Sequence, residues 1–484
     1  MRLSDLLGEW RASFTPDLDI QGVKNDSRQV KPGDLFLAYP GAAVDGRLYC
    51  GQAILAGAVA VAFDSNALPE SFVKTSTVPY IAVPQLSKQI AAIASRFYGH
   101  PSQSLQVTGV TGTNGKTTIA YQLAAAYELL GSSAAYIGTL GQGDVKALKP
   151  VGNTTPDALC LQRLFHAYQN AGIKHVCMEV SSHALAQQRV EHIHFKQAIF
   201  TNLTHDHLDY HGNMEAYAAA KAALFAMPTL QYAIINQDDA YSSQMLAALP
   251  STCQALTYGL GEGALVRAVN VRISMNGSAF DIVSPWGTHA VLIKTLGAFN
   301  VYNALAVFTS LMAEGNAVEE VVRVMAKLAA SPGRMELVGE TPCVIVDYAH
   351  TPDALEKVLT TLVQLKEGRL WVVFGCGGDR DKAKRPMMGA IASRYADEVV
   401  LTSDNPRHEE AHVILSEIVA GVSAQAHVVQ RVDRKAAIHY ALSHAARNDI
   451  VLIAGKGHEN YQQIGSERFD FSDQVVVQEW LHLT

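Results

Sequence analysis

The sequence predicts an α/β protein of about three domains, and three observations support this. The chain has 484 residues, too many for one ordinary domain. The block 104–330 alternates apolar strands with helical segments, as a mostly parallel sheet requires. The alternation returns after residue 331, so we expect a smaller Rossmann-like domain there. Its strands are expected at 343–347, 370–375, 397–402, 426–430 and 450–454.

The segment before the central block is less regular, with short strands and turns up to about residue 86. We expect a small N-terminal α/β domain that ends near residues 85–88, before the helix that leads to His100-Pro101. A second boundary is expected at Ser331-Pro332-Gly333. Short alternating strands between about 253 and 295 predict an antiparallel addition to the central sheet. The expected domains are 1–87, 88–331 and 332–484.

Composition indicates a globular protein with an ample core, since 49% of the residues are hydrophobic and 17% are charged. The net charge is −7 and the chain has no long Lys/Arg run, which argues against nucleic-acid binding. The six cysteines show no paired metal spacing, so we expect reduced thiols and a cytoplasmic protein.

The amino terminus, residues 1–10, predicts the start of an amphipathic helix that contains acidic residues, which a signal peptide would not. Apolar runs fall short of the ~20 residues that span a bilayer, so no membrane insertion is expected. We also expect a monomer.

A phosphate-binding loop is expected at residues 107–118, Val-Thr-Gly-Val-Thr-Gly-Thr-Asn-Gly-Lys-Thr-Thr. An apolar strand leads into a Gly-rich turn whose backbone N–H groups can surround phosphate oxygens. Lys116 supplies a positive charge and Thr117 a hydroxyl for Mg²⁺. Position 110 is Val where the strict P-loop pattern has glycine, so the match is to a shorter form. The predicted ATP-binding residues of the loop are Gly112, Thr113, Asn114, Gly115, Lys116, Thr117 and Thr118.

Two further strands bring acidic and histidine side chains to the same expected edge. Glu179 closes the apolar strand 173–180, at the position where an α/β sheet places catalytic carboxylates. The next expected strand, 197–203, is followed by His205, Asp206, His207 and Asp209. Of the other histidines in this region, His192, His194 and His211 fit ordinary surface or helix-cap positions better.

Lys221 lies on an expected helix, Met214 to Met227, whose apolar residues repeat at helical spacing. Taken alone, Lys221 fits a surface lysine with its stem along apolar surface.

Together these motifs resemble the central domain of the Mur ligases, the ATP-dependent amide-forming enzymes of peptidoglycan precursor synthesis. The resemblance continues through motifs at 296–304, 332–336, 346–355, 374–381 and 454–459. The run Asp404-Asn405-Pro406-Arg407 resembles the amino-acid signature of the branch that adds meso-2,6-diaminopimelate.

The resemblance implies a reaction. The D-glutamyl γ-carboxylate of UDP-N-acetylmuramoyl-L-alanyl-D-glutamate is phosphorylated by ATP, and the acyl phosphate is taken by the diaminopimelate amine. Cofactors would be ATP and Mg²⁺. The implied fold has an N-terminal UDP-binding domain, a central P-loop ATPase-like domain with a mostly parallel sheet, and a C-terminal Rossmann-like domain.

Site residues follow from the same resemblance. The implied catalytic residues are Lys116, Glu179, His207 and Lys221. The implied metal ligands are Thr117, Glu179, His207 and a carbamylated Lys221, in which CO₂ turns a cation into an anion that can ligate Mg²⁺. Asn300, Arg334 and Asp347 would complete the ATP site.

Both substrates have implied contacts as well. Those for the UDP-muramoyl-dipeptide are Asn25, Ser27, Asn153, Thr154, Thr155, Ser181, Gln187 and Arg189. Those for diaminopimelate are Arg380, Asp404, Asn405, Pro406, Arg407, Gly455 and Glu459. A guanidinium fork at Arg407 would pair with the second carboxylate of diaminopimelate, which lysine lacks, and such a site can reject the analogue by roughly 10⁴-fold.

Three alternatives remain open. The lysine-adding relative is distinguished by Arg407. Folylpolyglutamate synthetase shares the loop and the chemistry but is not expected to carry Asp26-Ser27-Arg28 or the 404–407 run. A P-loop switch or ATP-regulated binding module would use nucleotide only to change shape, and it gives Glu179, His207 and Lys221 no purpose.

Overall fold

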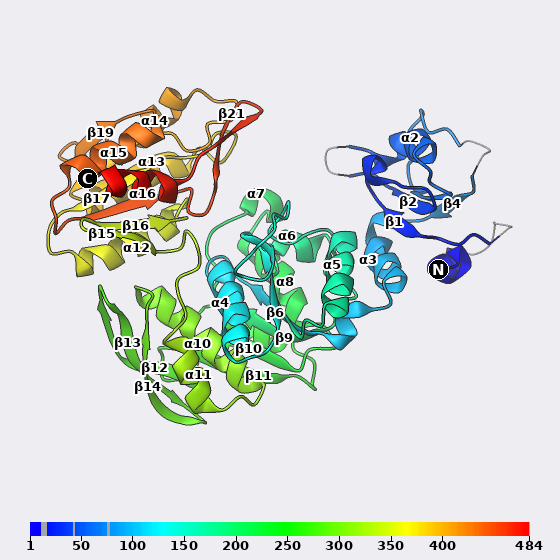
Figure 1. Cartoon of the computed structure of the whole chain (residues 1–484), viewed down its shortest axis with the longest axis horizontal. Helices are drawn as coiled ribbons and strands as arrows, with labels where there is room; N and C mark the ends of the chain where they lie inside the picture. The colour runs from blue at the N-terminus through cyan, green and yellow to red at the C-terminus, as the bar shows by residue number, and fades with distance from the viewer. Residues whose placement is uncertain (11–16, 42–43, 75–77, 484) are drawn as a thin grey trace.

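The computed structural model describes residues 1–10, 17–41, 44–74 and 78–483. Three domains follow one another along the chain, and each is built on its own sheet. Figure 1 shows the N-terminal and C-terminal domains on opposite sides of the central one.

The N-terminal domain has a four-stranded parallel sheet in the order β1-β2-β3-β4. Its strands are β1 (Gly22–Lys24), β2 (Asp34–Ala38), β3 (Ala60–Asp64) and β4 (Tyr80–Val83). Its helices are α1 (Leu3–Leu7), α2 (Cys50–Leu55) and α3 (Leu86–Phe97), with short 3-10 turns η1 (Gly8–Trp10), η2 (Ser27–Gln29) and η3 (Gly46–Tyr49).

The expected domain boundary at residue 87 falls inside helix α3. Ile90 and Ile93 of this helix are buried in one hydrophobic cluster with Leu35 and Leu37 of β2. A helix that shares the core of the first sheet folds with that sheet. We therefore propose that the boundary lies after α3, and we retain the expected second boundary near residue 331 as a prediction.

The central domain has a ten-stranded sheet in the order β14-β13-β12-β11-β10-β9-β5-β8-β6-β7. Its strands are β5 (Gln106–Thr111), β6 (Ala134–Gly138), β7 (Gly141–Gly143), β8 (His175–Glu179), β9 (Phe195–Phe200), β10 (Tyr232–Asn236), β11 (Gln254–Gly259), β12 (Val266–Ser274), β13 (Gly277–Ser284) and β14 (Gly287–Ile293). Strands β6, β8, β5, β9, β10 and β11 are parallel, which confirms the expected sheet type. The antiparallel addition is smaller than expected, because β11 pairs in parallel with β10 and the antiparallel pairs begin at β12–β13.

Helices cover both faces of the central sheet. These are α4 (Lys116–Leu129), α5 (Ala158–Asn170), α6 (Ser182–Ala186), α7 (Leu208–His211), α8 (Met214–Phe225), α9 (Ser242–Ala247), α10 (Ala298–Ala313) and α11 (Val318–Met325), preceded by the 3-10 turn η4 (Pro101–Ser104). One hydrophobic cluster joins the sheet to α4, α10 and α11, and a second joins it to α5, α6, α8 and α9. The strands between these layers are buried along nearly their whole length, as parallel strands covered on both faces should be.

The C-terminal domain has a six-stranded sheet in the order β15-β16-β20-β17-β18-β19 and a separate hairpin, β21–β22. The strands are β15 (Glu336–Glu340), β16 (Cys343–Asp347), β17 (Leu370–Phe374), β18 (Glu398–Leu401), β19 (His427–Gln430), β20 (Ile450–Ala454), β21 (Tyr461–Ile464) and β22 (Glu467–Asp470). The helices are α12 (Pro352–Leu365), α13 (Lys384–Tyr395), α14 (Ala411–Val419), α15 (Arg434–His444) and α16 (Asp473–Leu483).

Each C-terminal strand expected from an apolar run is present within a residue or two. The antiparallel edge strand β15 and the hairpin were missed, because their residues are mostly half-buried or exposed and carry no apolar run.

Strand order brings distant loops together. Strands β9, β5 and β8 are neighbours, with Val110 opposite Glu179 and Thr111 opposite Phe200. The loops that follow these three strands therefore share one edge of the sheet, where ligands of α/β proteins bind. Within the described ranges, none of the helices has the length and hydropathy needed to span a membrane.

Candidate active site

The turn between β5 and α4 has the backbone of an anion-binding loop. Gly112 has φ +150°, and a Cβ there would lie 1.8 Å from Thr201 Oγ1, so a larger residue does not fit. Gly115 precedes α4 in the left-handed region, with φ +88° and no side-chain cap on the helix. The first N–H groups of α4 are thus left for an anion, which the positive end of the helix dipole also favours.

Two lysines converge on this loop. Lys116 Nζ donates to the carbonyls of Gly112 at 2.9 Å and Thr113 at 2.8 Å. Lys221 Nζ donates to the same Gly112 carbonyl at 2.9 Å and lies 4.4 Å from the centre of the Tyr217 ring. Burial lowers the pKa of both amines, well below the usual value for Lys221.

Lys221 is therefore not the surface lysine that its helix pattern alone suggests, since it is only 1% exposed. The Asp206 carboxylate favours the charged form of the Lys221 amine, whereas burial and the Lys116 charge disfavour that form. Two ammonium groups on one carbonyl repel each other, and Lys221 is buried, so the site favours an uncharged or chemically converted Lys221.

Glu179 ends β8 and is 1% exposed. Its carboxylate accepts four hydrogen bonds, from Thr117 Oγ1 at 3.0 Å, Tyr136 Oη at 2.5 Å, Thr139 N at 2.8 Å and Thr139 Oγ1 at 3.2 Å. Sequence reasoning missed Tyr136, which lies in the middle of the neighbouring strand β6, and Thr139, which directly follows that strand. Such partners hold a buried carboxylate in one orientation, as ligand-supporting groups do at metal sites.

The loop after β9 contributes Asp206 and His207. His207 has a left-handed backbone, φ +54°, and its Nε2 lies 3.5 Å from Asp206 Oδ2. Its ring stands edge-on to His183 at 4.9 Å. His205 and Asp209 are exposed and do not line the cavity described next.

His211, expected at an ordinary surface or helix-cap position, ends α7 and also packs beside this site. Its ring stacks on Tyr217 at 5.0 Å, and its Nε2 lies 2.9 Å from Ser182 Oγ. His192 and His194 are exposed, as expected.

A cavity of about 230 Å³ gathers these groups. Its lining from the central domain includes Thr113, Asn114, Gly115, Lys116, Thr117, Thr139, Thr154, Glu179, Ser181, Asp206, His207 and Lys221. The C-terminal domain contributes Arg334, Tyr348, His350 and Thr351. The structure thus brings together every residue that the sequence proposed for catalysis.

The donor set of this smaller cavity fits Mg²⁺ in its usual protein setting. In the described residues no three His, Cys, Asp or Glu side chains are arranged as a closed metal site. Mg²⁺ is ordinarily held by one or two carboxylates together with substrate phosphates and waters. Glu179, the Thr117 hydroxyl and the neighbouring phosphate loop match that pattern.

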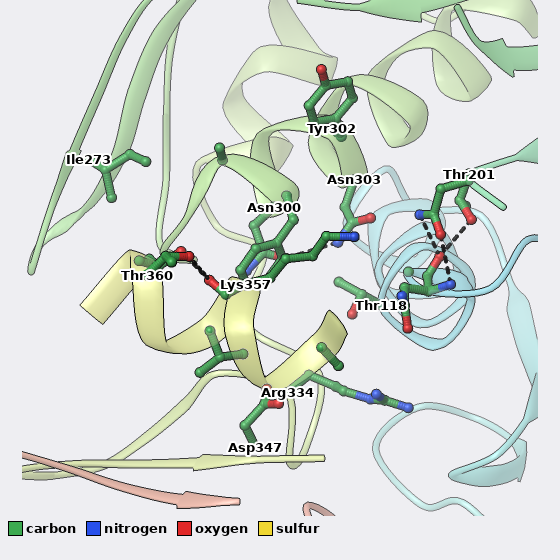
Figure 2. Close-up of a pocket in the computed structure, with 18 of the residues that line it drawn as sticks. Thr118, Thr201, Ile273, Asn300, Tyr302, Asn303, Arg334, Asp347, Lys357 and Thr360 are labelled. Carbon is green, nitrogen blue, oxygen red and sulfur yellow. Dashed lines mark hydrogen bonds between the residues drawn. The ribbon is translucent and has the colours of Figure 1, made fainter. Parts of the chain in front are cut away.

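A larger cavity of about 430 Å³ lies next to the phosphate loop, between the central and C-terminal domains. Its lining includes Asn114, Gly115, Thr118, Thr201, Asn300, Tyr302, Asn303, Arg334, Asp347, Lys357 and Thr360. Figure 2 shows Arg334 extending toward the helix that carries Thr118, and Lys357 extending from α12 toward Asn303. A mostly apolar cleft with a few polar groups is the usual form of a small-molecule site.

The predicted residues Asn300 and Asp347 both line this larger cavity. Asn300 Oδ1 accepts from Asn303 Nδ2 at 3.0 Å. Asp347 accepts from the backbone N–H groups of Met335 and Ala349, each at 2.7 Å, and burial raises its pKa.

Arg334 lines both cavities and joins the two domains. Its guanidinium lies 4.5 Å from the centre of the Tyr348 ring, and one nitrogen lies 3.4 Å from Thr117 Oγ1. A second link joins Asn114 Nδ2 to Asp353 Oδ2 at 3.1 Å. Tyr348 and Asp353 stand in the sequence motif 346–355, yet sequence reasoning assigned a role there to Asp347 alone.

The expected amino-acid pocket lies in the C-terminal domain. Asn405 Nδ2 donates to Glu459 Oε2 at 2.8 Å, and Lys456 Nζ donates to Asn405 Oδ1 at 3.0 Å. Gly455 has φ +109°, and a Cβ there would lie 2.8 Å from Asp404 Oδ2. The structure therefore brings together most of this expected set and adds the fully buried Lys456, which the sequence did not single out.

The pocket arginines lie on adjacent loops. Arg407 has φ +50°, and one guanidinium nitrogen donates to the Gly378 carbonyl at 2.8 Å. Arg380 is exposed near Gly377, and Pro406 is buried.

The residues expected to hold the UDP-muramoyl-dipeptide form two groups. Near the smaller cavity, Thr155 Oγ1 donates to the Glu179 carbonyl at 2.9 Å, and Arg189 donates to the Thr155 carbonyl at 2.9 Å and to Gln187 Oε1. Thr154 and Ser181 line that cavity, and Asn153 is exposed beside them.

Asn25 and Ser27 lie in the N-terminal domain. Asn25 Nδ2 donates to Tyr39 Oη at 3.2 Å, and Ser27 Oγ donates to Gln52 Oε1 at 3.1 Å. Burial raises the pKa of Tyr39, and the Arg189 charge opposes this shift.

Comparisons with known proteins identify the family of this chain. The chain matches three families: "Mur ligase family, catalytic domain" at residues 19–98, "Mur ligase middle domain" at 110–311 and "Mur ligase, glutamate ligase domain" at 333–457. It is 46% identical over 470 residues to a UDP-N-acetylmuramoyl-L-alanyl-D-glutamate–2,6-diaminopimelate ligase of Chromobacterium violaceum, covering 96% of this chain and 94% of that protein. The enzyme of the same name from Pseudomonas aeruginosa is 46% identical over 460 residues, with 94% of each covered.

A solved structure of an enzyme with this name superposes with a TM-score of 0.72 at 35% identity, covering 100% of this chain and 99% of that one. Matches to all three domains, together with identity of this level over nearly the full length, show that the chain belongs to the Mur ligase family.

Proposed function

We propose that this protein is an ATP-dependent ligase that joins meso-2,6-diaminopimelate to UDP-N-acetylmuramoyl-L-alanyl-D-glutamate in peptidoglycan precursor synthesis. The observation that carries the reaction class is the smaller cavity, in which a phosphate loop, Glu179, Lys221 and Arg334 meet. The substrate assignment is supported by relatives of this name at 43–46% identity over nearly the whole chain.

The chemistry follows from the poor reactivity of a carboxylate toward an amine in water. In the first step, an oxygen of the D-glutamyl γ-carboxylate bonds to the γ-phosphorus of ATP, and ADP leaves. In the second, the diaminopimelate amine attacks the acyl carbon, phosphate leaves with the bonding electron pair, and the nitrogen loses a proton. Positioning and charge neutralisation provide most of the rate acceleration in phosphoryl transfer of this kind.

Lys116 and the first amides of α4 are proposed to hold the β- and γ-phosphates. Thr117 and Glu179 would hold one Mg²⁺, and His207 would help to hold a second. Mg²⁺ at such a site neutralises charge on the transferring phosphoryl group. The orientation of Glu179 depends on Tyr136 and Thr139, which donate to it from the neighbouring strand and turn.

Lys221 is proposed to be carbamylated and to ligate the second metal. Carbamylation joins CO₂ to the neutral amine with loss of a proton, and it replaces the repelling cation with an anion. The burial of Lys221 and the acceptor it shares with Lys116 both favour that replacement. A carbamate oxygen would then face the same cavity as Asp206 and His207.

The nucleoside of ATP is proposed to occupy the larger cavity, because this cavity continues from Gly115 and Thr118 of the loop. Asn300 lies on its central-domain wall, and Asp347 and Arg334 lie on its C-terminal wall. A ligand shared by two domains is enclosed only when the domains are close, so movement of the C-terminal domain would gate turnover.

The two remaining substrates are proposed to extend in opposite directions from the smaller cavity. The UDP-muramoyl-dipeptide would run along Ser181, Thr155 and Arg189 to Asn25 and Ser27. Diaminopimelate would lie against the 404–407 run, where Arg407 pairs with its far carboxylate and Glu459 with its far ammonium. Lysine would leave Arg407 without that carboxylate.

We further propose that the protein acts as a cytoplasmic monomer. The six cysteines are free in the structure, which is consistent with a reducing compartment.

The test is a ligation assay with the purified protein, ATP, Mg²⁺ and UDP-N-acetylmuramoyl-L-alanyl-D-glutamate, with either meso-diaminopimelate or L-lysine added. Phosphate release and product mass are followed together. We expect a ligated product with diaminopimelate alone. A preference for lysine would overturn the pocket assignment, and ATP hydrolysis without any ligated product would overturn the ligase.

A further inference from the structure

Two loops of the C-terminal domain meet beneath the proposed amino-acid pocket. The glycine loop, residues 375–381, follows β17, and the recognition loop, residues 402–409, follows β18. Gly378 N donates to the Asn405 carbonyl at 2.9 Å, and a Cβ on Gly378 would lie 1.9 Å from the Pro406 carbonyl oxygen. The two backbones are thus in direct contact, and the Arg407 guanidinium bonds across the junction to the Gly378 carbonyl.

A buried ion pair crosses this junction. The guanidinium of Arg385, which is fully buried in the first turn of α13, donates to both carboxylate oxygens of Glu409, at 2.9 and 3.0 Å. The same guanidinium donates to the Gly377 carbonyl at 3.1 Å. One side chain therefore holds the recognition loop, through Glu409, and the glycine loop, through Gly377.

Glu409 makes a second connection between the loops. Its Oε1 accepts from the backbone N–H of Asp379 at 2.7 Å, so the carboxylate that faces Arg385 also holds the glycine loop directly. Bidentate charge-assisted pairs of this kind fix direction as well as distance. The guanidinium beside it lowers the pKa of Glu409, which keeps the carboxylate ionised near neutral pH.

The helix that carries Arg385 is itself rigidly placed. A Cβ on Gly389 of α13 would lie 2.1 Å from the Ile418 carbonyl of α14, so the two helices are in close backbone contact. Glu417 of α14 accepts at 2.5 Å from Arg385 Nη1, the nitrogen that also donates to Glu409 Oε2. A cation in the first turn of a helix is disfavoured by the helix dipole, and these carboxylates offset that effect.

Arg407 needs such support because its backbone is strained. Its φ of +50° is uncommon for a residue with a side chain. The hairpin β21–β22 holds its backbone from one side, through Arg407 N to the Gln463 carbonyl at 3.1 Å and Gly465 N to the Arg407 carbonyl at 2.7 Å. On the other side, the guanidinium rests on the Gly378 carbonyl of the glycine loop at 2.8 Å.

We infer that Arg385 and Glu409 are positioning residues for amino-acid selection: their ion pair sets the spacing of the two loops and so places Arg407 to hold the far carboxylate of the incoming diamine. This inference rests on the proposed function. Neither residue touches the substrate; each acts through the loop that carries Arg407.

The test makes the same chemical change, Glu to Gln, in each of two carboxylates that bond to the Arg385 guanidinium. Glu409→Gln removes the charge from the partner that lies in the recognition loop. Glu417→Gln removes the charge from the partner on α14, which belongs to neither loop, and serves as the matched control. For each variant, kcat/KM is measured with meso-diaminopimelate and with L-lysine, together with KM for ATP, KM for the UDP-muramoyl-dipeptide and the thermal midpoint.

For Glu409→Gln we expect kcat/KM for diaminopimelate to fall by about tenfold or more while that for lysine changes little, because a small displacement of Arg407 weakens only the contact to the second carboxylate. The KM values for ATP and the UDP-muramoyl-dipeptide should stay within about twofold, and Glu417→Gln should keep the wild-type substrate ratio. Arg385→Lys, which keeps the charge and loses the fork, should shift the ratio in the same direction.

An equal loss with both amines, or an equal change of the ratio in Glu409→Gln and Glu417→Gln, would overturn the inference. A fall in the thermal midpoint with an unchanged ratio of kcat/KM for the two amines would also overturn the inference. Such a result would mean that the ion pair only stabilises the fold. A failure of the proposed function gives a different result. The wild-type protein would then prefer lysine over diaminopimelate, and there would be no selectivity for diaminopimelate that Arg385 and Glu409 could support.

Discussion

The side-chain nitrogen of Asn114 lies 3.1 Å from Oδ2 of Asp353, and this hydrogen bond joins the phosphate loop to the first turn of α12 in the C-terminal domain. The same carboxylate oxygen accepts from Lys357 at 2.9 Å. The phosphate loop and the C-terminal domain are therefore linked at the wall shared by the two cavities.

Replacing this carboxylate should weaken domain closure. We expect Asp353→Ala to lower kcat/KM for ATP by about tenfold, which corresponds to ~1.4 kcal/mol. The expected effect is modest because the Asp353 carboxylate is 39% exposed, where solvent weakens its interactions. Steady-state kinetics measures the loss, and small-angle X-ray scattering with a non-hydrolysable ATP analogue measures closure. Glu356→Gln, on the same helix but bonded to Tyr395 within its own domain, is the control. Unchanged kinetics in Asp353→Ala would show that the link does not assist closure.

The hydroxyl of Tyr136 should matter through Glu179, to which it donates at 2.5 Å. Tyr136→Phe keeps the ring and removes this donor, so we expect the Mg²⁺ concentration for half-maximal activity to rise by about 10-fold to 100-fold. A Mg²⁺ titration of activity at saturating substrates checks this. Tyr232→Phe, at the start of β10, removes a hydroxyl that lines neither cavity and should leave the titration unchanged.

Gly112 should tolerate no side chain. A Cβ there would lie 1.8 Å from Thr201 Oγ1, in a backbone region that L residues rarely adopt. We expect Gly112→Ala to weaken nucleotide binding by about 100-fold or more, because the loop must move by an ångström to admit the methyl group. Isothermal calorimetry with ADP measures this.

Gly51 provides the matched comparison for that change. It lies in α2 with no atom within 4 Å of an added Cβ, so Gly51→Ala should bind ADP normally and raise helix stability by about 0.5–1 kcal/mol. Equal ADP affinity in the two variants would mean that the loop backbone does not hold the phosphates.

His458 should make stability depend on pH. Burial lowers its pKa from 6.5 to about 4, against a smaller opposing effect of its bond to the Thr139 backbone. Below pH 6.5 the unfolded chain takes up a proton that the folded protein does not. The stability contribution is therefore complete above pH 6.5 and is lost as the pH falls toward 4, with a slope of at most about 1.4 kcal/mol per pH unit.

His458→Gln should remove this part of the loss of stability at acid pH. The thermal midpoint of the variant should therefore fall less steeply than that of the wild type between pH 6.5 and 4. His444→Gln changes an exposed histidine on α15 and should retain the wild-type slope. Parallel curves for the wild type and His458→Gln would contradict the assignment.

Much of the fold could be predicted because its signals are local. The C-terminal strands β16, β17 and β20 are continuous apolar runs, and a run of this length between turns identifies a buried parallel strand from neighbouring residues alone. The phosphate loop was predictable for the same reason, since glycine, lysine and threonine within residues 112–118 determine its backbone and its chemistry. The 404–407 run indicated the amino-acid pocket, although its contacts could not be derived from it.

The sequence by itself determined the buried apolar strands, the loop motif and the resemblance that named the family, but not the edge strand β15 or the hairpin β21–β22. Only the tertiary structure decided which distant side chains meet: Tyr136 with Glu179, Asn114 with Asp353, and Arg385 with Glu409. It also decided that Lys221 is buried on the Gly112 carbonyl rather than exposed on its helix. The reason is physical: periodicity reports which face of an element is apolar, whereas contacts between elements depend on strand order and helix packing, which join residues far apart in the chain.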